Sequence, residues 1–141
     1  MSEKNIVITD CDNTPLARVG ANYQDETLAL AASAPDRVVK AGTLMARTIA
    51  TGKTAVYVKG GDPVVNGVAF AVLAADVCDD AGAGGDFPCR PLVTGEVTAS
   101  QLIIDADGDN SNIEAVEVDS LRDFSILVVQ TTQLAKLDNP Q

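Results

Sequence analysis

The hydrophobic pattern of the chain changes at Arg37, where short apolar and β-branched runs separated by turn-forming residues begin. Runs of this kind are typical of β-strands bounded by turns. One run, VAFAVLAADV at 68–77, is nearly all apolar, as expected for a strand buried on both faces. The pattern predicts a mostly β (β-rich α+β) fold, a small β-sheet or barrel-like domain. Its strand regions are 37–49 with an interruption at Gly42, 55–59, 68–77, 89–100 and 124–130.

One short helix is expected within residues 111–124, SNIEAVEVDSLRDF. Ile113, Val116 and Leu121 fall on one face of about two to three helical turns. Ser111 is the candidate N-cap, because its hydroxyl can accept a hydrogen bond from a free N–H of the first turn.

The chain divides into three regions by composition. Residues 1–36 show no sustained period and contain several Asn, Asp, Gly and Pro breaks, so we predict an extended N-terminal arm. Residues 37–130 form the β-rich domain, and residues 131–141 are a polar C-terminal tail. The arm is either a disordered terminus or a segment that orders by adding a strand to a partner.

The stretch IATGKTAVYV at 49–58 superficially resembles a phosphate-binding loop. That loop needs a second glycine five residues before Gly52, and Arg47 stands there. Lys53 and Thr54 are followed by β-branched and aromatic residues, which predict a strand where the motif needs a helix. We therefore interpret ATGKT as a turn.

Charge excludes several kinds of partner. The net charge is −10 with a pI near 4.2, and the ten basic residues are scattered, so neither nucleic acid nor an anionic membrane surface is an expected partner. The first ten residues lack the apolar run of a signal peptide, and 68–77 is too short to span a membrane. We expect a soluble protein made in a cytoplasm.

Three cysteines, Cys11, Cys78 and Cys89, do not predict a disulfide framework, because an odd number without an export signal favours free thiols. A bridge between Cys78 and Cys89, which flank one loop, is the alternative. Zinc binding is not expected, since the chain has no His and no C-x-x-C pair.

Asp105, Asp107 and Asp109 alternate as the first ligands of a calcium loop do. Such a loop requires Gly at its sixth position and Glu at its twelfth, and these positions hold Asn110 and Val116. We interpret the segment as a solvated acidic turn, with a weak surface calcium site as the alternative.

Catalysis is not expected. Without His the commonest general base is missing, and no nucleophile motif is present. Neighbouring carboxylates fit solvated charge. The chain is therefore predicted to be no enzyme and to have no cofactor and no metal.

Three phrases in a fixed order carry a family resemblance: GTLM at 42–45, VAFAVLAA at 68–75 and PLVTGEV at 91–97. Their order and spacing resemble those of the head decoration, or capsid-cementing, proteins of tailed bacteriophages, of which the phage lambda protein is the familiar member. The resemblance covers roughly residues 35–130. Where a lambda-like protein has a basic residue after the Leu-Val pair, this chain has Thr94, so no role of that residue carries over.

The resemblance implies a structural virion protein on the outer surface of the expanded phage head. Such proteins bind as homotrimers and stabilise contacts between subunits of the major capsid protein. The alternative is a small β-rich calcium- or glycan-binding module unrelated to capsids.

For capsid contact we expect the arm, with Tyr23, Leu28 and Leu30 as apolar anchors and Thr27 in the added strand. Deleting residues 1–35 is then expected to abolish head binding while leaving a folded domain.

Overall fold

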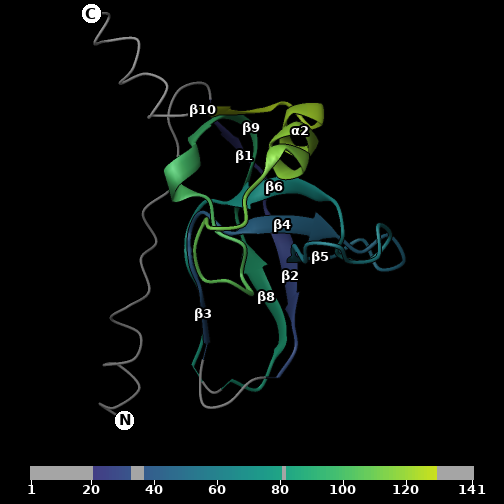
Figure 1. Ribbon diagram of the computed structural model, residues 1–141. Helices are drawn as coiled ribbons and strands as arrows, with labels where there is room; N and C mark the ends of the chain where they lie inside the picture. The colour runs from purple at the N-terminus through teal and green to yellow at the C-terminus, as the bar shows by residue number, and fades with distance from the viewer. Residues whose placement is uncertain (1–20, 33–36, 81, 130–141) are drawn as a thin grey trace, which may run out of the picture.

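The computed structural model describes residues 21–32, 37–80 and 82–129, and these form a mostly β domain with one α-helix (Figure 1). The predicted fold class is confirmed. No helix in the described ranges is long and apolar enough to span a membrane. The elements are β1 (Asn22–Tyr23), β2 (Glu26–Leu30), β3 (Arg37–Val39), β4 (Leu44–Arg47), β5 (Thr54–Val56), β6 (Ala69–Leu73), β7 (Val77–Asp79), β8 (Gly85–Cys89), β9 (Pro91–Thr98), the 3₁₀ turn η1 (Ala99–Gln101), α2 (Ala115–Asp123) and β10 (Ile126–Val129).

Eight strands form the main sheet, in the order β1-β9-β6-β4-β5-β2-β8 with β10 pairing parallel to β9. The strands β3 and β7 make a separate antiparallel pair. Parallel pairing of β9 and β10 requires a crossover connection, and α2 lies in that connection.

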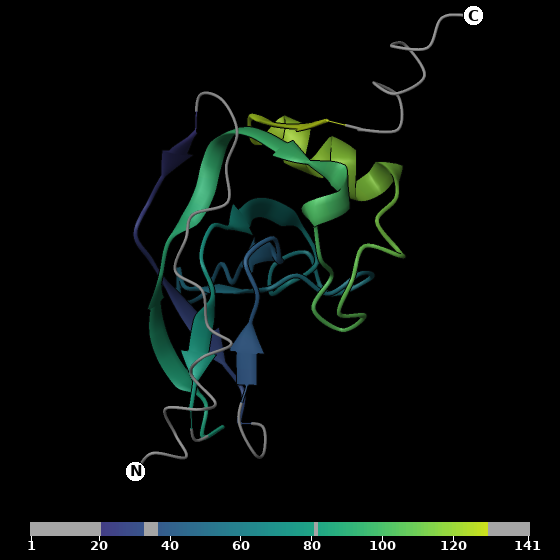
Figure 2. The same cartoon turned by 90° about the vertical axis from the view of Figure 1, so that its left-hand side faces the viewer.

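One long ribbon curls the sheet. From Tyr23 opposite Leu92 to Leu30 opposite Gly85, β1 and β2 run antiparallel to β9 and β8 in a single register. Figure 2 shows the purple β1 and β2 beside the green β8 and β9. At one end of the ribbon β9 pairs with β6, and at the other end β2 pairs with β5, while β4 joins β6 to β5. The sheet therefore curls on itself as a half-barrel.

The predicted boundary between arm and domain at residue 36 is wrong. Residues 22–30 supply β1 and β2, and Leu28 and Leu30 lie inside the domain with 0% and 7% of their surface exposed. Alternation of Thr27, Leu28, Ala29 and Leu30 places both leucines on one face of a strand, and the curled sheet covers that face. Residues 1–20 and 33–36 of the predicted arm, and the predicted tail at 131–141, lie outside the described residues.

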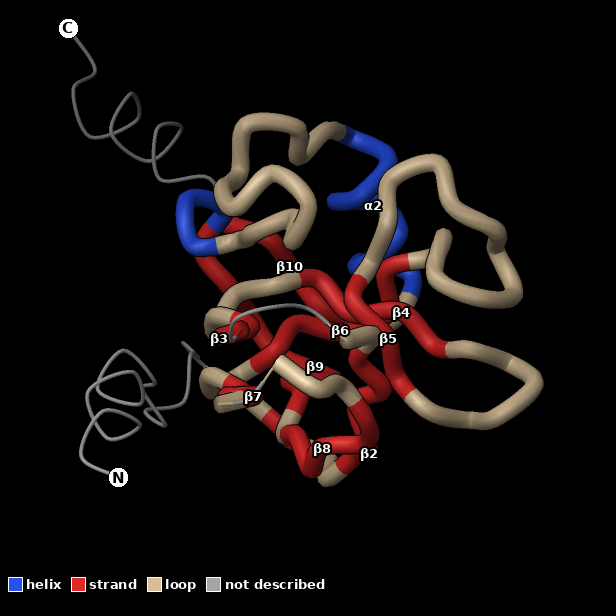
Figure 3. Tube along the Cα trace, turned by 90° about the horizontal axis from the view of Figure 1, so that it is seen from below, coloured by secondary structure: helices blue, strands red, loops and turns tan. Residues whose placement is uncertain are grey.

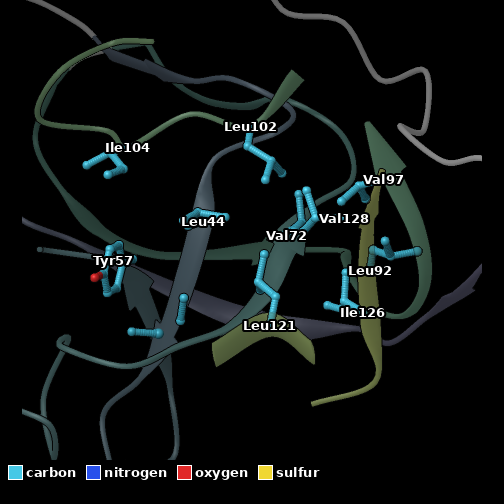
Figure 4. Close-up of a cluster of buried hydrophobic side chains, with 12 residues drawn as sticks. Leu44, Tyr57, Val72, Leu92, Val97, Leu102, Ile104, Leu121, Ile126 and Val128 are labelled. Atoms are coloured by element: carbon cyan, nitrogen blue, oxygen red, sulfur yellow. The ribbon is translucent and has the colours of Figure 1, made fainter. Parts of the chain in front are cut away.

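Two apolar clusters fill the two faces of β4 and β6. Leu44 and Val72 belong to a cluster that α2 and β10 cover through Leu121 and Ile126 (Figure 4). Met45, on the other face of β4, packs in a second cluster whose members are Leu28, Leu30, Val39, Ala71, Leu73, Val77 and Cys89. Strand 68–77 was predicted to be buried on both faces, and β6 is buried at every position but Phe70.

Glycine is required at Gly42, the interruption predicted within 37–49. Its φ is 101°, and an added Cβ would lie 2.1 Å from the carbonyl oxygen of Gln101. The close approach lets the backbone of Leu44 donate to Ile103 and that of Ile103 donate to Gly42, both at 2.8–2.9 Å. Gly42 thus ties the start of β4 to the segment after η1.

The helix α2 was predicted correctly, but its N-cap was not. The helix begins at Ala115 with Glu114 as N-cap, whereas Ser111 lies in the preceding turn. Its inward residues are Glu117 and Leu121, and Val116 is 60% exposed rather than on the inner face. The difference arises because Glu117, a charged residue, is held inward by Tyr57 and Lys59 in the segment after β5.

The turn interpretation of ATGKT is confirmed. It joins the antiparallel strands β4 and β5, with Gly52 at φ 74° donating its N–H to Thr48 at 2.8 Å. Arg47 donates to the carbonyl of Gly52 at 2.8 Å, and Lys53 forms an ion pair with Asp86 at 2.5 Å. The lysine of the apparent motif is thus engaged with a neighbouring strand.

The expectation of free thiols holds for Cys89 only. Cys89 is a buried free thiol, so the alternative bridge between Cys78 and Cys89 is absent. Cys78 is disulfide-bonded, contrary to the expectation. Burial raises the pKa of the Cys89 thiol, which keeps it protonated and unreactive.

Candidate interaction surface

The four residues predicted to contact a capsid do not form one surface. Leu28 and Leu30 are core residues, and Leu28 pairs with Thr54 of β5 on one side and Phe87 of β8 on the other. Neither edge of β2 is open there, so β2 cannot be the strand added to a partner. Their prediction as apolar anchors is wrong for this reason.

Tyr23 and Thr27 remain at the surface. Tyr23 is half-buried against the cluster around Leu44, and the guanidinium of Arg90 lies 5.6 Å from its ring centre. The side chain of Thr27 is exposed, while its carbonyl accepts a hydrogen bond from the hydroxyl of Thr54 at 2.9 Å. Both residues thus sit on strands of the domain rather than on an arm.

The acidic turn is shaped by its own hydrogen bonds. A carboxylate oxygen of Asp109 accepts from the N–H of Ser111 at 3.0 Å, and hydrogen bonds from the hydroxyl and the N–H of Ser111 lower the pKa of Asp109. The side chain of Asn112 donates to Asp107 at 2.9 Å. Within the described residues, no group of three or more His, Cys, Asp or Glu could hold a metal ion.

A buried polar cluster attaches α2 to the strand region. Glu117, 1% exposed, accepts a hydrogen bond from the hydroxyl of Tyr57 at 2.7 Å and two from the ammonium of Lys59 at 3.0 Å. It also accepts the N–H of the N-cap residue Glu114 at 2.8 Å. Both oxygens of this carboxylate are therefore paired, and the cluster links α2 to the segment after β5.

The pKa shifts of the cluster agree with that role. Burial raises the pKa of Glu117, but hydrogen bonds from Tyr57, the backbone of Glu114 and Lys59 outweigh it, so the pKa lies below its usual value. Burial and the neighbouring carboxylate raise the pKa of Tyr57 to about 12. The carboxylate is thus held ionised and the phenol neutral, and no group is poised to exchange a proton near neutrality.

A second polar cluster surrounds Arg47. Its guanidinium makes two hydrogen bonds to Glu26 at 3.0 and 3.1 Å and stacks over the ring of Phe70 at 4.6 Å. The hydrogen bonds to Arg47 are the chief cause that lowers the pKa of Glu26. This cluster fixes β2 to β4, and it too is fully paired.

Three exposed apolar side chains gather where two loops meet. Ile49, Val64 and Val65 are 65%, 55% and 40% exposed, and we call them the apolar tip. The N–H of Ile49 donates to the carbonyl of Val64 at 2.9 Å, and the hydroxyl of Thr48 donates to the carbonyl of Val65 at 2.9 Å. The β4–β5 turn and the β5–β6 loop are thus joined, and they project beyond β4 and β5 on the right of Figures 1 and 3.

The loop that carries the two valines is fixed by its own backbone. Asp62 accepts the N–H groups of Val65, Asn66 and Gly67 at its carbonyl, within 3.0 Å, and that of Val64 at its carboxylate. An added Cβ at Gly67 would lie 2.1 Å from the carbonyl oxygen of Gly61, which shows how closely the loop closes on itself. Such a loop presents its side chains in a preorganised arrangement.

Sequence reasoning missed the apolar tip. The loop at 60–67, GGDPVVNG, contains Asp-Pro and Asn-Gly turn pairs, and these mark it only as a turn. The available signal was the pair Val64–Val65 between those turn residues, since a loop seldom buries its apolar side chains. The proximity of Ile49 to the two valines could not be predicted from the sequence, because it depends on the hydrogen bond between the β4–β5 turn and the β5–β6 loop.

Two hollows on the surface have mixed polar and apolar linings. One of about 450 Å³ lies beside α2, lined by Ala99, Asn110, Ile113, Glu114, Ala115, Val118, Asp119 and Arg122. Another of about 230 Å³ is lined by Asp25, Ala75, Asp76, Val77, Pro88, Cys89 and Arg90. The thiol in the second hollow, Cys89, is the buried one whose pKa burial raises. We take the apolar tip as the candidate functional surface because its side chains are exposed on hydrogen-bonded loops. No protein-family model and no curated protein matches this chain.

Proposed function

We propose that this protein is a head decoration protein of a tailed bacteriophage. It binds the outside of the expanded head as a homotrimer and stabilises contacts between subunits of the major capsid protein. It acts without catalysis and without a cofactor.

The observation that carries this proposal is the position of the three family-like phrases in the fold. Residues 42–45 lead into β4, residues 68–75 contain β6, and residues 91–97 lie in β9. In the sheet, β6 pairs with β4 on one side and β9 on the other. Phrases far apart in the chain thus form one continuous three-stranded unit, which favours a shared fold over chance similarity of separate segments.

The surface supports a role in binding. The apolar tip is exposed on hydrogen-bonded loops, whereas the buried polar groups of the described residues around Glu117 and Arg47 are paired internally. A protein that reinforces a capsid needs a stable fold and surfaces that bind other protein subunits. Three copies joined together bind multivalently, so modest individual contacts give slow release.

The alternative is a small β-rich calcium- or glycan-binding module, and the described residues bear only on its calcium form. The carboxylates of Asp107 and Asp109 are engaged in shaping their turn, and no cluster of three ligands occurs in the described ranges.

Co-sedimentation tests the proposal. The purified full-length protein is mixed with expanded, undecorated heads of the cognate phage and, separately, with unexpanded procapsids. Saturable binding to expanded heads alone is expected, because expansion creates the subunit contacts that the protein reinforces. Absence of binding to expanded heads, with the protein folded by circular dichroism, would reject the proposal.

The arm hypothesis needs a shorter deletion than the sequence suggests. Removing residues 1–20 leaves β1 and β2 in place, whereas removing 1–35 deletes both. The shorter deletion therefore separates capsid contact from folding. Retained binding by a folded protein lacking 1–20 would assign contact to the domain itself.

A further inference from the structure

The disulfide at Cys78 has a partner that the other cysteines of the chain identify. Cys78 is disulfide-bonded, whereas Cys89 is a buried free thiol. The sequence contains one further cysteine, Cys11, which lies outside the described residues. We propose that Cys11 is the partner of Cys78, so that a disulfide fastens the N-terminal segment to β7. The inference goes beyond the proposed function and does not rest on it, because the bond can be mapped without phage heads.

Strand geometry separates Cys78 from Cys89. Successive side chains of a strand point to opposite faces. In β7 the side chains of Val77 and Asp79 are buried, while Cys78 between them is half-buried. Val77 packs in the second cluster, and Cys89 belongs to the same cluster. Cys78 therefore faces away from the side of β7 on which Cys89 lies, and its partner has to approach from the outer face of the strand.

The chemistry of Cys89 also argues against it as a partner. The residue is 7% exposed, and its sulfur lies 3.7 Å from the hydroxyl oxygen of Thr54. Burial raises the pKa of this thiol. Thiol–disulfide exchange requires a thiolate that can reach the sulfur it attacks. Cys89 is therefore unable to displace the partner of Cys78.

The N-terminal segment is long enough to bring Cys11 to β7. The segment joins the described domain at Ala21, directly before β1. A chain extends by at most about 3.5 Å per residue, so the stretch from Cys11 to Ala21 can span up to about 35 Å. A domain of about a hundred residues has a radius of gyration of only about 13 Å. Tethering also gives Cys11 a high effective concentration at Cys78, which favours it over a cysteine of a second copy.

The position of the bond suits a stabilising cross-link. The strands β3 and β7 form a two-stranded pair apart from the main sheet, and such pairs have little stability of their own. Val39 and Val77 hold one face of the pair in the second cluster. The disulfide acts on the other face and closes a loop that contains β1 to β6. Closing so long a loop stabilises the fold, mainly by restricting the unfolded chain.

Formation of the bond requires an oxidant, and a small-molecule disulfide such as oxidised glutathione has the necessary chemistry. The thiolate of one protein cysteine attacks a sulfur of the small disulfide and releases one small thiolate. The second protein thiolate attacks the mixed disulfide, closes the bond between Cys11 and Cys78, and releases the second small thiolate. The two protein thiols together lose two protons and two electrons, and the small disulfide is reduced to two thiols. The cross-link is therefore sensitive to the redox state of the medium.

Peptide mapping tests the inference. Reduced full-length protein is incubated with oxidised glutathione, the remaining thiols are blocked under denaturing conditions, and the protein is digested with trypsin without reduction. Mass spectrometry should find the peptide 5–18, which contains Cys11, joined to the peptide that begins at Gly60 and contains Cys78. Fragmentation should place the bond at Cys78 and the blocking group at Cys89.

Two cysteine variants provide the controls. Cys11→Ser should lose the joined peptides, whereas Cys89→Ser should keep them. The oxidised forms of the wild type and of Cys89→Ser should each melt about 5 °C or more above their own reduced forms. Cys11→Ser should show no such difference between its oxidised and reduced forms.

Three results would overturn the inference. The first is blocking groups on both Cys11 and Cys78 in the oxidised wild type, and the second is a bond that joins Cys78 to Cys89. The third is a disulfide-linked dimer on a non-reducing gel that persists in Cys11→Ser, which would assign Cys78 to a second copy. None of these results depends on head binding, so the inference can fail while the proposed function stands.

Discussion

Residues 22–30 and residues 58–68 both differ from what their sequences indicate: the first was expected to be a surface arm and lies in the core, and the second was expected to be a turn and exposes apolar side chains. The first segment has the composition of a free arm, yet it supplies two strands of the half-barrel and buries Leu28 completely. The second reads as a turn between strands, yet it carries Val64 and Val65 on the surface. Backbone pairing accounts for the difference. The first segment satisfies its N–H and C=O groups by pairing along β8 and β9, and this pairing carries its leucines inside.

The second segment pairs its N–H groups within its own loop, while the carbonyls of Val64 and Val65 accept from Ile49 and Thr48 of the neighbouring turn. Asp62 accepts three successive N–H groups, so the loop needs no neighbouring strand and its side chains stay outside. In these two segments, apolar side chains are buried where the backbone pairs with neighbouring strands, and they are exposed where the backbone N–H groups pair within a loop. The following predictions test this contrast, beginning with the largest effect.

Deleting residues 1–35 should unfold the protein. The deletion removes β1 and β2 and leaves β5 and β8 without the strand between them. We expect loss of the cooperative urea transition, measured by circular dichroism. This outcome is the reverse of the folded remnant expected from the sequence. A cooperative transition in the deleted protein would show that the segment is an arm after all.

Leu28→Ala should lower the free energy of unfolding by about 2–5 kcal/mol, because the truncation leaves a cavity in the second cluster. Thr27→Ala is the matched control on the same strand. Its exposed side chain makes the expected change less than about 1 kcal/mol. Chemical denaturation measures both, and equal small effects would place Leu28 outside the core.

Glu117→Gln should lower the free energy of unfolding at neutral pH by about 1–3 kcal/mol, because Lys59 loses its buried ionic partner. The folded-state pKa of Glu117 lies below its usual value of 4.5. Its carboxylate therefore contributes stability above that pH, and this contribution is lost as the pH falls through the folded-state value. Denaturation at a series of pH values should show that the free energy of unfolding falls less steeply with decreasing pH in the variant than in the wild type. Parallel curves for the two proteins would contradict the role given to Glu117.

Val64→Thr should change the free energy of unfolding by no more than about 0.5 kcal/mol, because the side chain is already exposed. The same substitution at Val72, which is 0% exposed, should cost about 1–3 kcal/mol by burying a hydroxyl. Thermal or urea denaturation at a protein concentration where the chain is monomeric separates the two. A large effect at Val64 would mean that the tip belongs to the core.

The contrast also explains which parts of the fold could be predicted. The strand regions around β4, β5, β6, β9 and β10 have strong apolar or β-branched runs, and all were expected. The helix was expected from its spacing, but Glu117 on its inner face was not. A glutamate reads as solvent-exposed until Tyr57 and Lys59, about sixty residues away, are seen beside it.

The candidate surface was less predictable than the fold. Alternation at Thr27–Leu30 correctly indicated an extended segment, but it could not tell whether this chain or a partner supplies the neighbouring strand. The sequence of one strand does not identify the strand that pairs with it, because a β-strand is stabilised by contacts with residues distant in the sequence. The apolar tip depends on a contact between two loops and was invisible for the same reason.

The sequence by itself determined the mostly β class, the turn at ATGKT, the helix within 111–124 and the acidic net charge, because these follow from local composition and periodicity. Only the tertiary structure decided that residues 22–30 close the half-barrel, that Glu117 lies inside, and that Ile49 meets Val64 on the surface. Each of these depends on segments brought together by the curl of the sheet. The local hydrophobic pattern indicates which residues can form strands or be buried. The hydrogen-bond register between distant strands determines which of these residues are paired and buried in the fold.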